Sequence, residues 1–117
     1  MVYRFLPHPT GVPDGSEPGP VAPNLVAVET LKTKPPGFID PWLPADATET
    51  IGNNVEAYVD LNAPDGLTAG TDFRANVTSP GAFDRAYDLT QQPGVSDDQR
   101  KAATTHLFYT INWLHDW

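Results

Sequence analysis

Cysteine is absent from the 117 residues of this chain. Its absence excludes disulfide bridges and metal sites built on thiolates. Basic residues are scarce as well, since 7 Lys and Arg stand against 15 Asp and Glu and give a net charge of −8. An acidic surface repels phosphate groups, so we expect neither nucleic acid nor a membrane as a partner. No apolar run approaches the ~20 residues that a membrane-spanning helix needs.

Sequence motifs of catalysis are also missing. The chain contains no Gly-rich phosphate loop, no nucleophile elbow and no His-Glu-x-x-His motif. Its histidines are His8, His106 and His115. On one helix, His106 and His115 would point about 180° apart, because each residue turns the helix by about 100°. They cannot share a metal ion, so we expect histidines that hydrogen-bond at a packed surface and no zinc site within this chain.

Proline is abundant in the first part of the chain. There are 13 Pro and 9 Gly in all, and 10 of the prolines lie between residues 7 and 44. Proline removes a backbone donor and is excluded from helix interiors and central strands. Residues 1–50 are therefore predicted to form a Pro-rich extended segment that lies over another surface and builds no core of its own.

Alternating polarity marks the middle of the chain. Between residues 51 and 61 the apolar side chains share one face, with Asn53 among them. They are Ile51, Val55, Ala57, Val59 and Leu61. This period of two predicts a half-buried strand over 51–61. A turn is predicted after it at residues 64–66, which read Pro-Asp-Gly, and a second short strand over 73–77.

The strongest element is a predicted helix over 97–117. Ser96 and Gln99 read as a capping box, in which each side chain bonds a backbone N–H at the start of the helix. Apolar residues recur at helical spacing in one stripe, and aromatic residues widen it. The stripe consists of Ala103, Leu107, Ile111 and Leu114. A helix that is apolar on most sides is expected to be buried on most sides.

The rest of the chain offers too little to surround such a helix. The helix also reaches Trp117 without a Gly or Asn cap. We therefore expect residues 1–117 to be an incomplete piece of a larger folded protein. This segment would be rich in strands and loops and would end in the start of a buried helix at 96–117.

Two polar groups are candidates for chemistry. Asp60, Asn62 and Asp65 offer oxygen ligands beside a glycine, as calcium loops do, but they lack the EF-hand spacing and its late Glu. An ordinary turn is favoured there over a calcium site. His115 and Asp116 are adjacent, and neighbours on a helix point about 100° apart. A buried polar brace is therefore favoured over a catalytic pair.

Three segments together resemble the fungalysin-type metallopeptidases. Residues 107–116 read Leu-Phe-Tyr-Thr-Ile-Asn-Trp-Leu-His-Asp, similar to the Leu-Phe-Tyr-x-x-Asn-x-x-His-Asp stretch in a helix of that family. Residues 52–54 are similar to the family's Gly-Asn-Asn strand, and residues 88–93 to the segment that leads to the helix. The chain departs from the family at His106, where Asn is expected, and at Trp113.

The resemblance implies that residues 1–117 are the incomplete N-terminal segment of one α+β domain, the thermolysin-like catalytic domain of a secreted zinc endopeptidase. In that family the two histidines of His-Glu-x-x-His and a later Glu hold the zinc, and the Glu of the motif is the general base. This chain lacks the motif, so its implied role is structural and the chain alone is expected to be inactive. The implied structural positions are Gly52, Asn53, Asn54, Asn112, His115 and Asp116.

The partners implied by the resemblance are the remainder of the catalytic domain as a second chain, a propeptide, and protein or peptide substrates. Zinc would be bound by that remainder. The alternative is a small secreted binding or inhibitory module without catalytic activity. An enzyme with a metal ion of its own is a third hypothesis.

Overall fold

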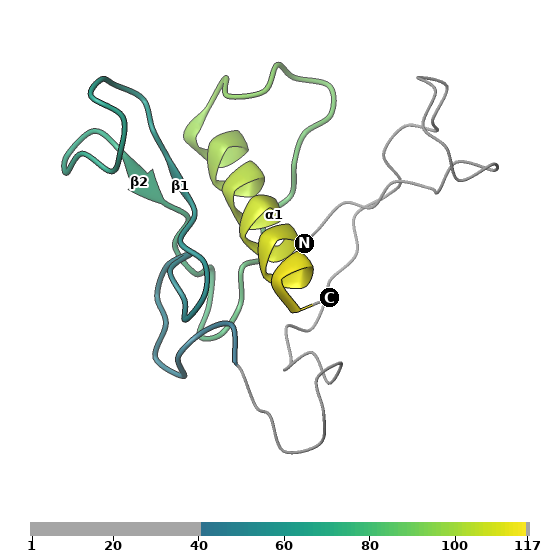
Figure 1. Ribbon diagram of the computed structural model, residues 1–117. Coiled ribbons are helices and arrows are strands. Elements are labelled where there is room, and N and C mark those ends of the chain that lie inside the picture. Colours follow the sequence, from purple (N-terminus) through teal and green to yellow (C-terminus); the bar gives the residue numbers. More distant parts are fainter. Residues whose placement is uncertain (1–40, 117) are drawn as a thin grey trace, which may run out of the picture.

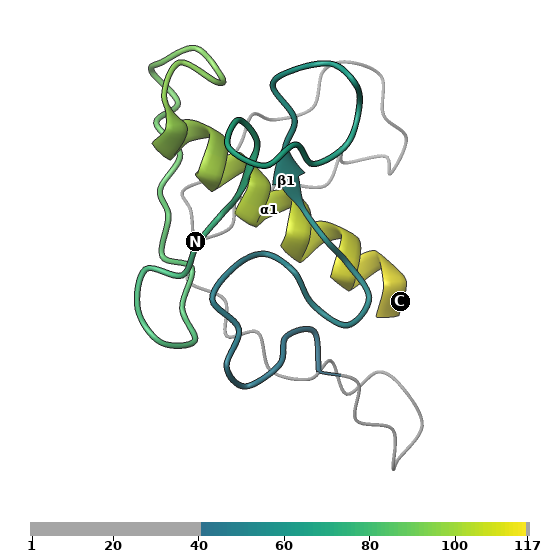
Figure 2. The ribbon, with the colours of Figure 1, turned by 90° about the vertical axis from the view of Figure 1, so that its left-hand side faces the viewer.

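The computed structural model describes residues 41–116 of the chain. Two short strands and one helix follow each other, β1 (Tyr58–Val59), β2 (Phe73–Arg74) and α1 (Asp97–Asp116). The strands pair with each other, and α1 lies along the side of β1 (Figures 1 and 2). This mixed content confirms the α+β class. Most of the predicted Pro-rich segment, residues 1–40, lies outside the described residues.

A buried threonine separates the two strands just beyond their last pair. The antiparallel pairs are Tyr58 with Arg74 and Val59 with Phe73. The same register would next place Ala57 opposite Ala75, and a regular ladder would join such a pair directly by backbone hydrogen bonds. Here Thr50 lies between the two alanines and bonds to both.

Thr50 replaces the direct backbone hydrogen bonds between Ala57 and Ala75 with bonds to each of them. Its backbone N–H donates to the Ala75 carbonyl (2.9 Å), and its carbonyl accepts the Ala57 N–H (2.9 Å). Its hydroxyl donates to the Ala57 carbonyl (2.7 Å) and accepts the Ala75 N–H (3.1 Å). All three residues are buried. The paired strands therefore end after two residues, because the segment that contains Thr50 takes the place of the ladder.

The predicted strand over 51–61 is wrong in its extent. The Gly52 N–H donates to the Val55 carbonyl (2.9 Å), and Ile51 bridges Glu56 in the antiparallel sense, so the chain reverses direction between them. Gly and Asn favour such a reversal because they tolerate turn conformations and bond locally. The alternating residues thus belong to two arms of a hairpin, and only Tyr58–Val59 is a strand.

The predicted strand over 73–77 is present in its first half as β2. Its second half pairs with the first arm of the hairpin, since Asn76 bridges Glu49. The Arg74 guanidinium pairs with Glu49 (3.3 Å) and also with Glu56. Because the two glutamates lie on opposite arms of the hairpin, one cation ties both arms to β2.

Helix α1 begins at Asp97, as the serine before it predicts. The Ser96 hydroxyl accepts the Gln99 N–H (3.3 Å), which is the expected N-cap bond. The other half of the predicted capping box is wrong. The buried Gln99 side chain bonds the preceding loop instead: its amide donates to the Asp88 carbonyl (2.8 Å) and accepts the Asp88 N–H (2.8 Å). Gln99 therefore fastens that loop to the helix.

Helix α1 is buried along one side within residues 41–116. The buried side chains are Gln99, Ala102, Thr104, Thr105, Phe108 and Asn112. The predicted apolar stripe lies elsewhere, with Leu107 49%, Ile111 41% and Leu114 55% exposed. Threonines can face the loops because their hydroxyls bond the preceding turn, as the Thr104 hydroxyl does to the Arg100 carbonyl (2.9 Å). The described residues therefore leave the stripe uncovered, and its burial within a larger domain stays a prediction.

No helix of the described part has both the length and the apolar character that crossing a membrane requires.

The charged first turn of α1, which includes Asp97 and Asp98, suits the positive end of the helix dipole. Arg100 pairs with Asp97 (2.8 Å) on the same turn. The beginning of α1 is therefore a solvated, capped helix start.

Replacing Thr50 by Val should weaken the fold. Val keeps the shape of Thr but removes the hydroxyl that serves the buried Ala75 N–H and the Ala57 carbonyl. A buried group left without its partner costs about 1–3 kcal/mol, so we expect the free energy of unfolding to fall by ~2 kcal/mol or more. Urea unfolding followed by circular dichroism measures the change. The T50S variant retains the hydroxyl and should lose less; an equal loss in both variants would contradict this role of the hydroxyl.

Candidate functional site

The Gly-Asn-Asn turn fits against a tryptophan and the helix. A Cβ atom on Gly52 would lie 1.9 Å from the Trp42 carbonyl oxygen and 3.2 Å from the Phe108 ring. Asn53 bonds the same segment, since its N–H donates to the Trp42 carbonyl (3.2 Å) and its side-chain amide to the Pro41 carbonyl (2.6 Å). The turn therefore needs a residue without a side chain at position 52, because backbone and helix approach it closely.

Trp42, which the Gly-Asn-Asn turn contacts, also packs directly against α1. Its ring meets the Tyr109 ring of α1 edge-on, with the ring centroids 5.6 Å apart. Trp42 is 3% exposed and Phe108 is 4% exposed, so both belong to the core. Asn54 lies exposed in the turn. The structural roles of Gly52 and Asn53 therefore have a physical basis in packing, while a role for Asn54 stays a prediction.

Asn112 is the most enclosed polar side chain of α1. It has no exposed surface, and its amide donates to the Phe108 carbonyl one turn earlier (2.8 Å). Within residues 41–116 its Oδ1 has no hydrogen-bond partner. His115, three residues further along α1, is exposed. The predicted burial of His115 is therefore not found, and a bracing role for His115 and Asp116 stays a prediction.

The histidines of α1 do not fit a zinc site. His106 and His115 are nine residues apart on one helix and point to opposite sides of it. Across the described range, no group of three or more His, Cys, Asp or Glu could hold a metal ion. Burial lowers the pKa of His106, so its imidazole is neutral at neutral pH. The third histidine, His8, lies outside the described residues.

In the acidic turn after β1, a carboxylate accepts a hydrogen bond from a backbone N–H of the same turn. The Asp60 carboxylate accepts the Gly66 N–H (2.9 Å), which is the bonding of an ordinary Asp turn. Asp60, Asn62 and Asp65 are all exposed. These observations agree with the favoured reading of a turn, and calcium at these three residues stays a prediction.

Asp72 organises the loop that joins the two strands. Its carboxylate accepts the Leu61 N–H (2.9 Å) and the Thr68 N–H (2.7 Å), so one side chain ties both ends of that loop. The Leu61 bond, followed by the Thr68 bond, lowers the pKa of the Asp72 carboxyl below its usual range. Sequence reasoning did not single out Asp72, because one Asp in a polar loop carries no pattern.

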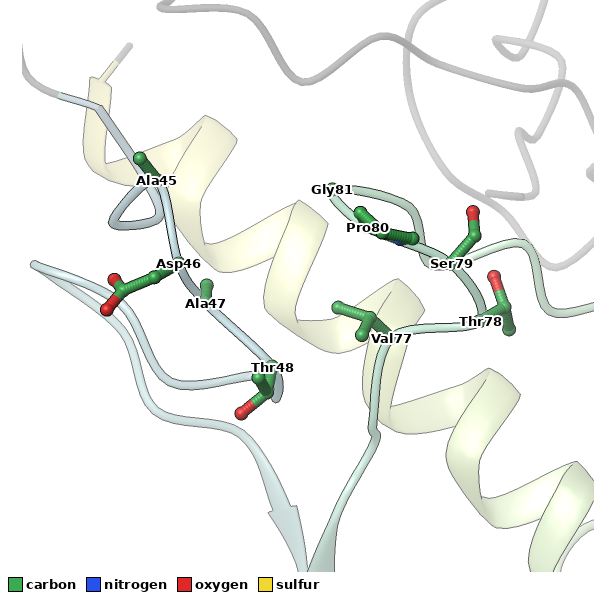
Figure 3. A pocket seen from close by; sticks show the side chains of 9 residues that line it. All are labelled: Ala45, Asp46, Ala47, Thr48, Val77, Thr78, Ser79, Pro80 and Gly81. Atoms are coloured by element: carbon green, nitrogen blue, oxygen red, sulfur yellow. The ribbon is translucent and has the colours of Figure 1, made fainter.

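A hollow of about 390 Å³ lies between residues 45–48 and residues 77–81 (Figure 3). Its side chains are small, and Figure 3 shows the Asp46 carboxylate pointing away from the facing segment. The lining includes the hydroxyls of Thr48, Thr78 and Ser79 but no histidine. A hydroxyl becomes a nucleophile only beside a general base, so this hollow does not fit a nucleophile–base pair.

Replacing Gly52 by Ala should destabilise the chain strongly. The added Cβ would overlap the Trp42 carbonyl oxygen, and backbone on both sides would have to move. We expect a loss of ~3 kcal/mol or more in the free energy of unfolding. Gly70 is the matched control, since its φ is +91° but nothing lies within 4 Å of its Cβ position. G70A should lose only about 1–2 kcal/mol from backbone strain; a larger loss than that of G52A would contradict the close approach.

Stability should also depend on pH through Asp72. Because its pKa is lowered in the folded state, the ionised carboxylate contributes stability above its unfolded pKa of about 3.9. This contribution is lost as the pH falls through the folded pKa. D72N should therefore be less stable than the original chain at neutral pH, with a difference that shrinks in acid. Urea unfolding as a function of pH tests this, with D65N as an exposed control. A difference that stays constant across the range would refute it.

A comparison with known families matches almost the whole chain. A model described as fungalysin metallopeptidase (M36) matches residues 6–117. The matched range contains the Gly-Asn-Asn turn, the loop held by Gln99 and the whole of α1. Neither the search of curated proteins nor the search of solved structures gave a match. Because the family model spans nearly the entire sequence, the chain belongs to the fungalysin metallopeptidase family.

Proposed function

We propose that this chain forms the N-terminal structural part of the thermolysin-like catalytic domain of a zinc-dependent endopeptidase. Membership of a metallopeptidase family supports hydrolysis of peptide bonds as the activity of the whole domain. The zinc ligands and the general base would come from polypeptide outside these 117 residues. Two facts support this division: the sequence has no His-Glu-x-x-His motif, and the two described histidines diverge on α1.

The exposed apolar side of α1 is the observation that carries the proposal. Ala103, Leu107, Ile111 and Leu114 lie within about 80° of one another around the helix axis, at 100° per residue. All four are exposed among the described residues. Contiguous apolar surface of this kind marks a site of contact with other polypeptide.

Covering this surface would stabilise the assembled domain considerably. Full burial of a large aliphatic side chain contributes about 1.5–3 kcal/mol relative to exposure. Leu107, Ile111 and Leu114 are each between 41% and 55% exposed, so about half of that contribution is still to be gained at each. The inner side of α1 is already filled by Phe108 and Asn112. The chain therefore supports one side of α1, and the rest of the catalytic domain would support the other.

We also propose, on the basis of the family, that the enzyme is secreted, is made with a propeptide and cleaves protein substrates outside the cell. Zinc is the metal that the family membership favours. The remainder of the domain, as a separate chain or a covalent continuation, is the partner that this proposal requires. The competing hypothesis of a binding or inhibitory module requires no such partner.

A charge placed on the apolar stripe should block assembly. Leu114 is 55% exposed, so L114E should leave the circular dichroism of this chain unchanged. In the complete enzyme the carboxylate would be buried without a partner, at a cost of several kcal/mol. We expect zinc-dependent peptidase activity to fall by about tenfold or more, since each ~1.4 kcal/mol is a factor of ten. Cleavage of a quenched fluorescent peptide measures this activity.

The matched control is L89E, since Leu89 is 56% exposed but lies in the loop before α1. It should retain the activity of the original enzyme. Equal activity in L114E and L89E would sink the proposed role of the stripe. Metal analysis provides a second check: the 117-residue chain alone should bind no stoichiometric zinc, and stoichiometric zinc with peptidase activity would favour an enzyme with its own metal site.

A further inference from the structure

The loop that joins β1 to β2 contains an aspartate followed by a glycine, Asp65 and Gly66 (Figure 1). Among the described residues this is the one place where glycine follows aspartate. Asp65 is exposed and lies outside the strands and the helix. Gly66 has a φ of +113°, and nothing lies within 4 Å of the position that a Cβ would take. The Asp65 side chain therefore has open space beside the residue that follows it.

We propose that Asp65 is a site of spontaneous isomerisation to isoaspartate, and that the Asp60 carboxylate slows this reaction by holding the Gly66 N–H. The reaction needs no enzyme and no cofactor, because water is its only co-reactant. It concerns the covalent chemistry of the chain itself, so it does not depend on where the zinc ligands lie.

The reaction proceeds through a cyclic imide. The Gly66 nitrogen loses its proton to solvent base and attacks Cγ of Asp65, so that a new N–C bond forms while a carboxyl oxygen leaves as water. Water then attacks the backbone carbonyl carbon of Asp65 and breaks its bond to the Gly66 nitrogen. The chain now continues through Cγ, which is isoaspartate; attack at Cγ instead restores aspartate. One water molecule is released and one is consumed, and nothing is oxidised or reduced.

Glycine at position 66 is the first support. A side chain on the residue after an aspartate obstructs the approach of its nitrogen to Cγ, and glycine has none. Other exposed aspartates of the described part are followed by residues with a side chain: Asp46 by Ala, Asp84 by Arg and Asp88 by Leu. A helix or strand would also fix the backbone and keep the nitrogen from Cγ, but Asp65 lies in neither.

A hydrogen bond at the attacking nitrogen is the second support. The Asp60 carboxylate accepts the Gly66 N–H (2.9 Å). Attack requires this nitrogen to lose its proton, and a neighbouring carboxylate disfavours the resulting anion, as any like charge does. The same hydrogen bond stabilises the nitrogen with its proton in place. Because a carboxylate is far too weak a base to remove a peptide proton, Asp60 slows the reaction.

The two ends of the loop are held, so the modification stays local. The Asp72 carboxylate accepts the Leu61 N–H (2.9 Å) and the Thr68 N–H (2.7 Å). Isoaspartate adds one backbone carbon at position 65, which lies between these two attachment points. The strands before and after the loop can therefore keep their pairing. Isomerised molecules should accumulate in the folded protein.

Timed incubation of the complete protein at neutral pH and physiological temperature tests the proposal. Digestion after Glu56 and Arg74 releases residues 57–74 as one peptide. Electron-transfer fragmentation in a mass spectrometer distinguishes isoaspartate from aspartate at each position of that peptide. Isoaspartate should accumulate at Asp65 and not at the other two aspartates of the peptide. The circular dichroism of the incubated protein should not change.

Removing the Asp60 carboxylate tests its role. In D60A isoaspartate should form about fivefold faster, which corresponds to ~1 kcal/mol at ~1.4 kcal/mol per factor of ten. D84A is the matched control, since it removes an exposed carboxylate outside the loop and should leave the rate unchanged. In a synthetic peptide of residues 57–74 the D60A substitution should have no effect, because the hydrogen bond depends on the fold.

Three results would overturn the proposal. The first is the absence of isoaspartate at Asp65 from both the original protein and D60A. The second is a D60A rate equal to or below the original rate, since the carboxylate would then have no effect or would act as a base. The third is an equal acceleration by D60A in the folded protein and in the peptide, because the effect would then come from the local sequence and not from the hydrogen bond.

Discussion

The hydrogen bonds of Thr50 are the interaction on which the rest of this structure depends. One residue supplies the donor and acceptor atoms that would otherwise join Ala57 and Ala75 directly. Three backbone segments thereby meet at a single buried point, and each buried polar group there is paired, as folded proteins require. The hairpin that contains Thr50 carries Gly52 to the Trp42 carbonyl and the Phe108 ring. Thr50 thereby links the paired strands to the turn that packs against α1.

Polar side chains make up an unusual share of the interior of this chain. Five apolar residues are buried in the described part, against six polar or charged ones. Most of these polar groups bond the backbone, as Gln99 does to Asp88 and Thr105 does to Lys101. Such bonds specify geometry but contribute only about 0.5–1.5 kcal/mol each. The large aliphatic side chains of α1 remain on the surface, so most of the apolar stabilisation that this helix can supply lies in contacts outside the described residues.

Family membership and geometry both support the proposal that this chain has a structural role while other polypeptide carries the zinc site. The chain belongs to the fungalysin metallopeptidase family, and its described residues form a scaffold in which Gly52 and Gln99 connect loops to α1. One side of α1, around Phe108, is buried against this scaffold. The other side exposes leucine and isoleucine. The proposed role, a structural lobe that supports a metal centre on other polypeptide, would account for both sides.

The sequence alone determined those features that depend on local chemistry. Ser96 predicted the start of α1 because an N-cap hydroxyl acts within one turn, and the spacing of His106 and His115 excluded a shared metal because helix geometry is regular. Only the tertiary structure decided where the segment 51–61 reverses and which side of α1 is buried. Alternation along a hairpin looks the same as alternation along one strand, and a helix shows its apolar side without showing which neighbours cover it. Both outcomes depend on contacts between residues distant in sequence, such as Thr50 with Ala75 and Gly52 with Phe108.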